Sequence, residues 1–190
     1  MNGKQWTHTD HVDELTWQAP AGSDLFISPA TGKANCVAPV YYTEVEGDFV
    51  LRGKVTHPFL STYDAGGFLI HQDDTHWAKV CYELTGEGTH AAITMVTNGV
   101  SDDCTGPCAS GPWIWMQIAR KGKVFGFYYS EDGKTFSLLR IFTILADDKI
   151  RVGLVAQCPK GDGAEVQFAD VGLYHISLSD LHNGSVELTK

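Results

Sequence analysis

The segment His76–Leu84 brings together residue types that could bind a polar ligand. Successive side chains of a β-strand point to opposite faces of the sheet, so this segment would place Trp77, Lys79 and Glu83 on one face. The other face would carry apolar and aromatic side chains, namely Val80, Tyr82 and Leu84. We therefore predict one core face and one face that carries an indole, an ammonium and a carboxylate.

Two interpretations of this polar face stay open. In the first, the face is a ligand groove in which an aromatic ring stacks on a sugar or peptide and polar groups fix its orientation. In the second, Trp77 packs against a loop, and Lys79 and Glu83 form a solvated ion pair worth about 0–1 kcal/mol.

A second aromatic face is predicted in the segment Trp113–Arg120, where Trp113 and Trp115 project to the same side. Two tryptophans on one strand face must be covered or used for binding. We expect Trp115 to add stacking area to that of Trp77. In the segment Val124–Ser130, the same alternation sets Phe125, Phe127 and Tyr129 on one side.

Catalytic groups are harder to find in the sequence. Glycoside hydrolysis needs two carboxyl groups about 5–9.5 Å apart across the scissile bond. The nearest pattern is the segment Glu44–Asp48, with acids at alternate positions, but Gly47 indicates a turn there. No serine lies in the Gly-x-Ser-x-Gly motif of a hydrolase nucleophile. The spacing of the eight histidines identifies no catalytic partner for any of them. A glycoside hydrolase is therefore only an alternative to a binding protein.

Metal and redox sites are also weakly indicated. Adjacent acids such as Asp73-Asp74 and Asp102-Asp103 are typical of turns, although Asp102, Asp103 and Asp64 are the first candidates for calcium. His71 and His76 flank one such turn and could share a metal ion. Cys104 and Cys108 lack the C-x-x-C spacing of zinc or redox motifs. We predict no cofactor and no resident metal.

Short strands separated by turn residues would position these side chains. Period-two alternation and turn signals predict strands over 47–56, 67–71, 76–84, 91–97, 113–120, 124–130, 135–143, 150–157 and 164–168. Lys121-Gly122, Asp132-Gly133 and Asp73-Asp74 provide hairpin turns between some of them. No long segment has helical periodicity, so we predict an all-β, two-sheet antiparallel sandwich that forms a single domain over residues 1–190.

Composition narrows the class of partner. The net charge of −9 and the lack of a Lys/Arg cluster argue against nucleic acid as a partner. We expect no membrane span and no export signal, because neither a run of 18 apolar residues nor an apolar signal core occurs. Five irregularly spaced cysteines suit free thiols in a reducing compartment, which predicts a cytoplasmic protein.

Several ordered motifs resemble a known family. They include the run Tyr63–Phe68, the spacing of Trp77, Lys79 and Glu83, and Thr97 followed by Ser101-Asp102. Further along lie Tyr129-Ser130-Glu131-Asp132-Gly133 with Arg140, Val152-Gly153-Leu154 with Pro159, and Phe168 with Asp170. In these residues the chain resembles domain-of-unknown-function family 1349, which includes the regulation-of-enolase proteins and belongs to the concanavalin A-like lectin/glucanase superfamily.

The resemblance implies a concanavalin A-like jelly roll and a superfamily habit of carbohydrate recognition, although fold alone does not establish function. Ala65, Asp103 and the run Ala34–Val37 depart from the family pattern and put its groove in doubt. Together with the strand patterns, the matches give the candidate ligand-binding set Tyr63, Asp64, Trp77, Lys79, Glu83, Thr97, Asp102, Trp115, Tyr129 and Arg140.

We therefore predict a noncatalytic binding module with a concave polar and aromatic sheet face, for a carbohydrate or small metabolite. The first alternative is a protein-interaction or regulatory protein that acts on a cytosolic metabolic enzyme. The second alternative is the glycoside hydrolase considered above.

Overall fold

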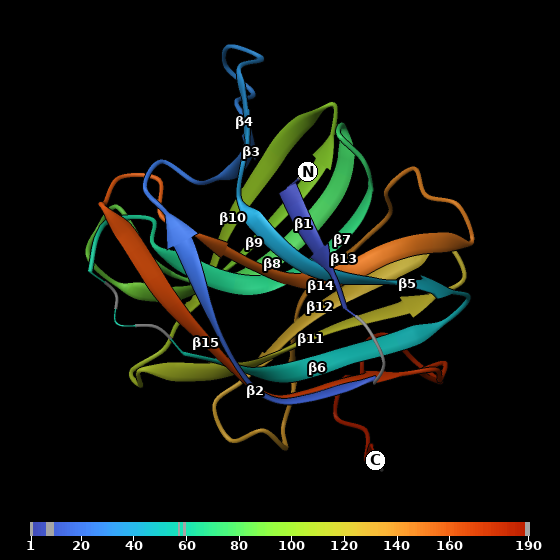
Figure 1. The fold of residues 1–190 in the computed structure, drawn as a ribbon. Coiled ribbons are helices and arrows are strands. Elements are labelled where there is room, and N and C mark those ends of the chain that lie inside the picture. The colour runs from blue at the N-terminus through green and yellow to red at the C-terminus, as the bar shows by residue number, and fades with distance from the viewer. Residues whose placement is uncertain (1, 7–9, 57, 59, 189–190) are drawn as a thin grey trace.

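The computed structural model describes residues 2–6, 10–56, 58 and 60–188 and contains two large β-sheets packed face to face (Figure 1). The seven-stranded sheet runs in the order β1 (Asn2–Gln5), β5 (Pro39–Glu46), β14 (Lys149–Gln157), β7 (Ala65–Asp73), β8 (His76–Leu84), β9 (His90–Asn98) and β10 (Val100–Cys108). The six-stranded sheet runs in the order β13 (Ser137–Phe142), β12 (Val124–Ser130), β11 (Trp113–Lys121), β6 (Phe49–Thr56), β15 (Gly163–Tyr174) and β2 (His11–Pro20).

These sheets confirm the predicted all-β sandwich. Neighbouring strands pair antiparallel except β1, which pairs parallel with β5. Within the described part of the chain no residue is helical, and accordingly no helix could cross a membrane. The predicted turns also form, with Gly122 and Gly133 at φ values of +58° and +72°.

A small third sheet pairs β3 (Leu25–Ile27) with β4 (Ala34–Cys36). Figure 1 shows this β3–β4 hairpin standing beyond the two large sheets at the top of the view. The strand ranges predicted from the sequence include neither its two strands nor β10.

The main core lies between the two large sheets. It contains the inward side chains of the central strands, including Val80 and Tyr82 of β8 and Ile118 of β11. The rings of Phe68 and Phe168 face each other across the sandwich with centroids 6.5 Å apart. Burial of such large apolar side chains is the dominant stabilising contribution to a sandwich of this kind.

The outer face of the six-stranded sheet is covered by the C-terminal segment. Leu178 and Leu181 join Tyr128 in a separate buried cluster, and the Tyr128 hydroxyl donates a hydrogen bond of 2.6 Å to the Leu181 carbonyl. Arg52 donates hydrogen bonds of 3.1 Å to the carbonyls of Gly184 and Val186. The C-terminal segment thus leaves little of this outer face open, whereas two cavities open on the outer face of the seven-stranded sheet.

Leu178→Ala is expected to lower the free energy of unfolding by about 2 kcal/mol, because Leu178 is only 2% exposed and its removal leaves a cavity under the segment. Urea denaturation followed by fluorescence measures the change. Ile176→Ala is the matched control, since Ile176 is 41% exposed and should contribute less than about 0.5 kcal/mol. Equal losses for the two variants would show that the segment is not packed as described.

Candidate functional site

Strand β8 has the register that its sequence predicts. Ala78, Val80 and Tyr82 point into the core between the sheets. Trp77 and Cys81 belong to a second buried cluster on the outer face of the seven-stranded sheet. The side chains of Lys79 and Glu83 lie on the same face and line a groove there. The indole, ammonium and carboxylate therefore share one face, as expected.

The β3–β4 hairpin covers part of this face. Leu25 and Ile27 of β3 pack in one cluster with Trp77 and Met95, and Trp77 is fully buried. The Trp77 indole is therefore not accessible for ligand stacking, contrary to expectation. Its indole nitrogen also has no hydrogen-bond partner within the described residues.

Two buried hydroxyl groups attach the hairpin to the sheet. The Ile27 amide donates a 2.9 Å hydrogen bond to Ser101 Oγ, and Ser101 Oγ lies 2.9 Å from Thr97 Oγ1. Thr97 is completely buried, so its hydroxyl anchors the hairpin and does not face a groove. The Asp24 carbonyl accepts hydrogen bonds of 2.9 Å from the amides of Val37 and Ala38 and closes the base of the hairpin.

Ser101→Ala is expected to loosen the β3–β4 hairpin, because the buried Ile27 amide then loses its acceptor at a cost of about 1–3 kcal/mol. Amide hydrogen exchange at Ile27 should become at least about ten-fold faster, while exchange in the centre of β8 stays unchanged. The matched control is Ser185→Ala, whose hydroxyl accepts a hydrogen bond from the Phe136 amide, just before β13 of the other sheet. Unchanged exchange at Ile27 would contradict the anchoring role.

A groove opens beside the hairpin, with a volume of about 430 Å³. We call it the polar groove. Its walls come from the hairpin, the outer face of the seven-stranded sheet and two loops, and its lining residues are Asp24, Phe26, Asn35, Tyr63, Lys79, Glu83, Met95, Asp103, Gln157, Pro159 and Lys160.

Lys79 forms the floor of the polar groove. Its side chain is only 2% exposed, and Nζ donates a 2.6 Å hydrogen bond to Gln157 Oε1. The Asp24 carboxylate of the hairpin lies 3.8 Å from the same nitrogen. A buried ammonium needs such partners, because the loss of hydration costs several kcal/mol.

Two further carboxyl groups face the polar groove. Burial raises the pKa of Glu83 to about 8, against the opposing attraction of Lys79. Partial desolvation likewise raises the pKa of Asp103, and Lys79 again opposes the shift. At pH 7 Glu83 is therefore mostly protonated, so its carboxyl group can both donate and accept hydrogen bonds.

Tyr63 and Asp64 lie in the loop before β7. Tyr63 adopts a left-handed φ of +70°, is 40% exposed and lines the polar groove. Asp64 is buried; its Oδ2 accepts a 2.8 Å hydrogen bond from the Ser61 amide, and its carbonyl accepts from the Leu84 amide. Asp64 thus holds the loop that presents Tyr63 and does not itself line the groove.

Four other predicted site residues lie away from the polar groove. Arg140 of β13 pairs with Asp102 of β10, with Nη2 2.9 Å from Oδ2, and joins the edges of the two sheets. Trp115 packs on the outer face of the six-stranded sheet, and Tyr129 packs against the main core. Alternation along a strand predicts the face of a side chain, but it does not predict which sheet the strand joins.

The metal-binding alternatives do not form a cluster. His76 Nδ1 lies 3.0 Å from Asp73 Oδ1, whereas His71 is buried beside Arg151 on the outer face. Throughout the described ranges, no group of three or more histidine, cysteine or acidic side chains could hold a metal ion. Cys104 and Cys108 are both exposed thiols on β10.

Sequence reasoning missed several groove residues. Gln157 is the last residue of a predicted strand, so its polar side chain at a strand end was a usable signal. Asp24 and Phe26 reach the groove only because the hairpin folds back over the sheet, and no local pattern predicts that contact. Asp103 was weighed only as a calcium ligand and as a departure from the family pattern.

Comparisons with known proteins agree with this fold. Regulation of enolase protein 1 of Saccharomyces cerevisiae is 28% identical over 131 residues, which cover 68% of this chain and 66% of the yeast protein. The chain thus spans just under two thirds of that relative's length. A crystal structure of a functionally unknown protein from S. cerevisiae matches with a TM-score of 0.79 and 25% identity, covering 84% of this chain and 86% of the other.

A more distant solved structure shares the fold alone. Xylan beta-1,4-xylosidase from Bacillus halodurans C-125 matches with a TM-score of 0.61 and 14% identity over 67% of this chain and 28% of that enzyme. The expected concanavalin A-like sandwich is therefore confirmed. Residues 1–175 match the family described as "Protein of unknown function (DUF1349)", and because this match covers almost the whole chain, the protein belongs to that family.

Proposed function

We propose that this protein is a noncatalytic binding module that holds a carbohydrate or a similar small polyhydroxylated metabolite in the polar groove. The observation that carries the proposal is the buried Lys79 ammonium, held by Gln157 at 2.6 Å on the floor of an open groove. A buried cation with fixed partners is a preorganised hydrogen-bond donor, and few precisely placed polar groups are typical of ligand sites.

The charges in the polar groove favour an uncharged ligand. Lys79 is already engaged by Gln157 and Asp24, and Glu83 is mostly neutral at pH 7. A phosphorylated ligand could reach the exposed Lys160 at the wall of the groove, but it would also approach the Asp24 and Asp103 carboxylates. Hydroxyl groups, in contrast, can donate to carboxylates and accept from a protonated carboxyl group.

Aromatic rings complete the requirements for sugar binding. Tyr63 at the rim and Phe26 of the hairpin line the polar groove. Apolar ring faces can stack on the C–H face of a sugar while polar neighbours bind its hydroxyl groups. These two rings take the stacking role that the sequence assigned to Trp77 and Trp115.

The test is a calorimetric binding screen with neutral mono- and oligosaccharides and polyols, with sugar phosphates as the charged comparison. A neutral ligand is expected to bind wild type, and Tyr63→Asn should weaken it at least about ten-fold. Asparagine removes the ring but tolerates the left-handed backbone. Glu83→Gln tests the carboxyl group, and Glu87→Gln, an exposed turn residue, is the matched control.

Two outcomes would overturn the proposal. One is a set of sugars that bind wild type and Tyr63→Asn equally while both proteins are folded. The other is hydrolysis of any glycoside in the panel, which would make the protein a glycosidase.

A regulatory role is the second candidate, and the relative named Regulation of enolase protein 1 favours it. In this case the protein would act on a cytosolic metabolic enzyme such as enolase. Five free thiols suit a reducing, cytoplasmic location. Trp113 is 37% exposed on the six-stranded sheet and offers an aromatic contact for a protein partner.

Analytical ultracentrifugation of the protein with purified enolase separates this candidate from the first. A stoichiometric complex that Trp113→Ala weakens, and that sugars do not displace, would favour regulation. Independent sedimentation of the two proteins at micromolar concentration would remove enolase as the partner.

A further inference from the structure

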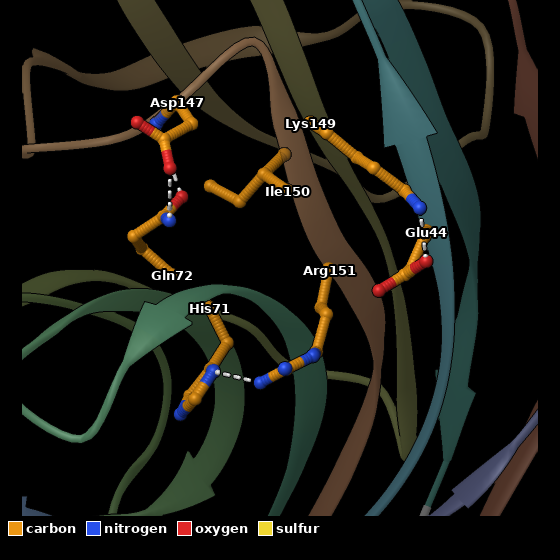
Figure 2. Close-up of a pocket in the computed structure, with 7 residues that line it drawn as sticks. All are labelled: Glu44, His71, Gln72, Asp147, Lys149, Ile150 and Arg151. Carbon is orange, nitrogen blue, oxygen red and sulfur yellow. Dashed lines mark hydrogen bonds and ion pairs between the residues drawn. The ribbon is translucent and has the colours of Figure 1, made fainter.

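A second cavity lies on the outer face of the seven-stranded sheet, at the end opposite Glu83. Figure 2 shows Arg151 in this cavity, reaching toward His71 between two pairs of interacting side chains. The volume is about 270 Å³, enough for a small organic molecule but not for an oligosaccharide. We call it the arginine cavity, and none of its lining residues belongs to the polar groove.

The two carboxylates that line the arginine cavity already have partners. Glu44 Oε2 lies 2.6 Å from Lys149 Nζ. Asp147 Oδ2 accepts a 2.9 Å hydrogen bond from Gln72 Nε2, and the Asp147 amide donates to Gln72 Oε1 at 3.1 Å. The hydrogen bond from Lys149 and, more weakly, the charge of Arg151 lower the pKa of Glu44, but in the described residues neither carboxylate forms an ion pair with the Arg151 guanidinium.

Arg151 is held in place by uncharged groups. Its Nη1 donates to His71 Nδ1 at 3.5 Å, and its guanidinium carbon lies 5.9 Å from the centre of the Tyr42 ring. His71 is only 3% exposed, and burial, followed by repulsion from Arg151, lowers its pKa. A neutral His71 can therefore accept this hydrogen bond, while Asp74 Oδ1 lies 3.9 Å from Nε2 on its far side.

These contacts leave a half-buried cation that no carboxylate of the described residues approaches within 4 Å, although Glu44 attracts it at longer range. A guanidinium has five N–H donors, and its planar fork matches the two oxygens of a carboxylate. Removal of a cation from water without a counter-ion is unfavourable, so the site gains most from an incoming anion. His71 and Tyr42 hold the Arg151 guanidinium in one orientation before a ligand binds, which lowers the entropy cost of binding.

We propose that the arginine cavity binds a small organic monocarboxylate through a two-point hydrogen bond from Arg151. Glu44 and Asp147 line the same cavity and repel any anion, so a ligand with a single negative charge fits better than phosphate, which carries more. This site is separate from the sugar-binding function proposed above and does not depend on it.

The test is an NMR titration of the protein with sodium acetate and sodium propionate at constant ionic strength, followed on the Arg151 Nε–Hε signal and the His71 ring. Both carboxylates should give saturable shifts. Acetamide should give none, and phosphate should bind more weakly. Arg151→Gln should weaken acetate binding at least about ten-fold. Arg151→Lys should weaken it less, because lysine keeps the positive charge but lacks the planar pair of N–H donors that binds both carboxylate oxygens.

Lys54→Gln is the matched control, since Lys54 lies over the Trp113 ring on the other sheet and should leave acetate binding unchanged. Shifts that grow linearly with salt, equal shifts in Arg151→Gln, or equal binding of phosphate would each overturn the proposal. If Arg151→Gln does not fold, the affinity of Glu44→Gln for acetate is the deciding measurement. This variant releases Lys149 and should tighten acetate binding, and unchanged or weaker binding would overturn the proposal.

Discussion

Gly67→Ala is expected to lower the free energy of unfolding by about 3 kcal/mol, the largest effect of a single methyl group that we predict for this protein. A Cβ atom at position 67 would lie 2.1 Å from the Val80 carbonyl oxygen and 2.8 Å from the Cys81 Cα. Both atoms belong to the backbone of β8, so no side chain can rotate away to relieve the contact. Urea denaturation measures the loss.

Gly122→Ala is the matched control. Gly122 has a φ of +58° and no heavy atom within 4 Å of the added Cβ, so alanine there costs only the left-handed conformation, about 1 kcal/mol. A difference of about 2 kcal/mol between the variants is therefore expected. Equal losses would mean that β7 and β8 do not approach each other as closely as described.

The same substitution links the fold to the polar groove. Gly67 pairs with Cys81, and Lys79 and Glu83 stand two residues to either side of that cysteine on the same face. A methyl group that pushes β8 away would move both polar side chains relative to Gln157 on β14. We therefore expect Gly67→Ala to weaken binding in the polar groove even where the protein remains folded.

Local alternation was sufficient to predict β8 correctly. Val80 and Tyr82 face the core because burial of apolar side chains fixes the register, and a slip by one residue would expose the whole set. Lys79 and Glu83 therefore had to emerge together on the other face. This part of the site follows from a period of two and from the hydrophobic effect.

The covering of that face could not be predicted in the same way. Strands β3 and β4 have only three residues each, which is too short for a period-two signal. Leu25 and Ile27 contact Trp77, about 50 residues further along the chain, so their role depends on tertiary packing. The indole was placed on the correct face, but its burial depends on a hairpin that has no local signature.

Strand β10 and the separation of Trp115 from Trp77 illustrate two other limits. Strand β10 contains Gly106 and Pro107, two residue types that are typical of loops. An edge strand with a β-bulge tolerates both of them. Trp115 does face away from the core, as its alternation predicts, but β11 belongs to the six-stranded sheet. Sheet membership is set by the order of strands, which a single-strand pattern does not contain.

Glu83→Gln is expected to stabilise the protein at alkaline pH, by an amount on the order of 3 kcal/mol at pH 9. Burial raises the folded-state pKa of Glu83 from its ordinary 4.5 to about 8. Between these values the folded protein keeps a proton that the unfolded chain releases. Stability from this group is therefore fully present below pH 4.5 and is lost as pH rises through 8.

Glutamine has nearly the same shape and does not titrate, so it removes this loss. Urea denaturation of wild type and Glu83→Gln at pH 4.5, 7 and 9 measures the difference, which should grow with pH. Other groups that titrate in this range affect both proteins and cancel in the comparison. Glu87→Gln, on an exposed turn, should change stability by less than about 0.5 kcal/mol at every pH.

A pH-independent difference between wild type and Glu83→Gln would show that the carboxyl group is well hydrated or firmly paired with Lys79. The polar groove would then present a charged carboxylate at pH 7, and an uncharged ligand would lose its advantage there. A difference that grows with pH would instead support a neutral Glu83 beside a buried ammonium. The desolvation of Glu83, with Asp24 and Asp103 nearby, outweighs the attraction of Lys79, which is why we expect the second result.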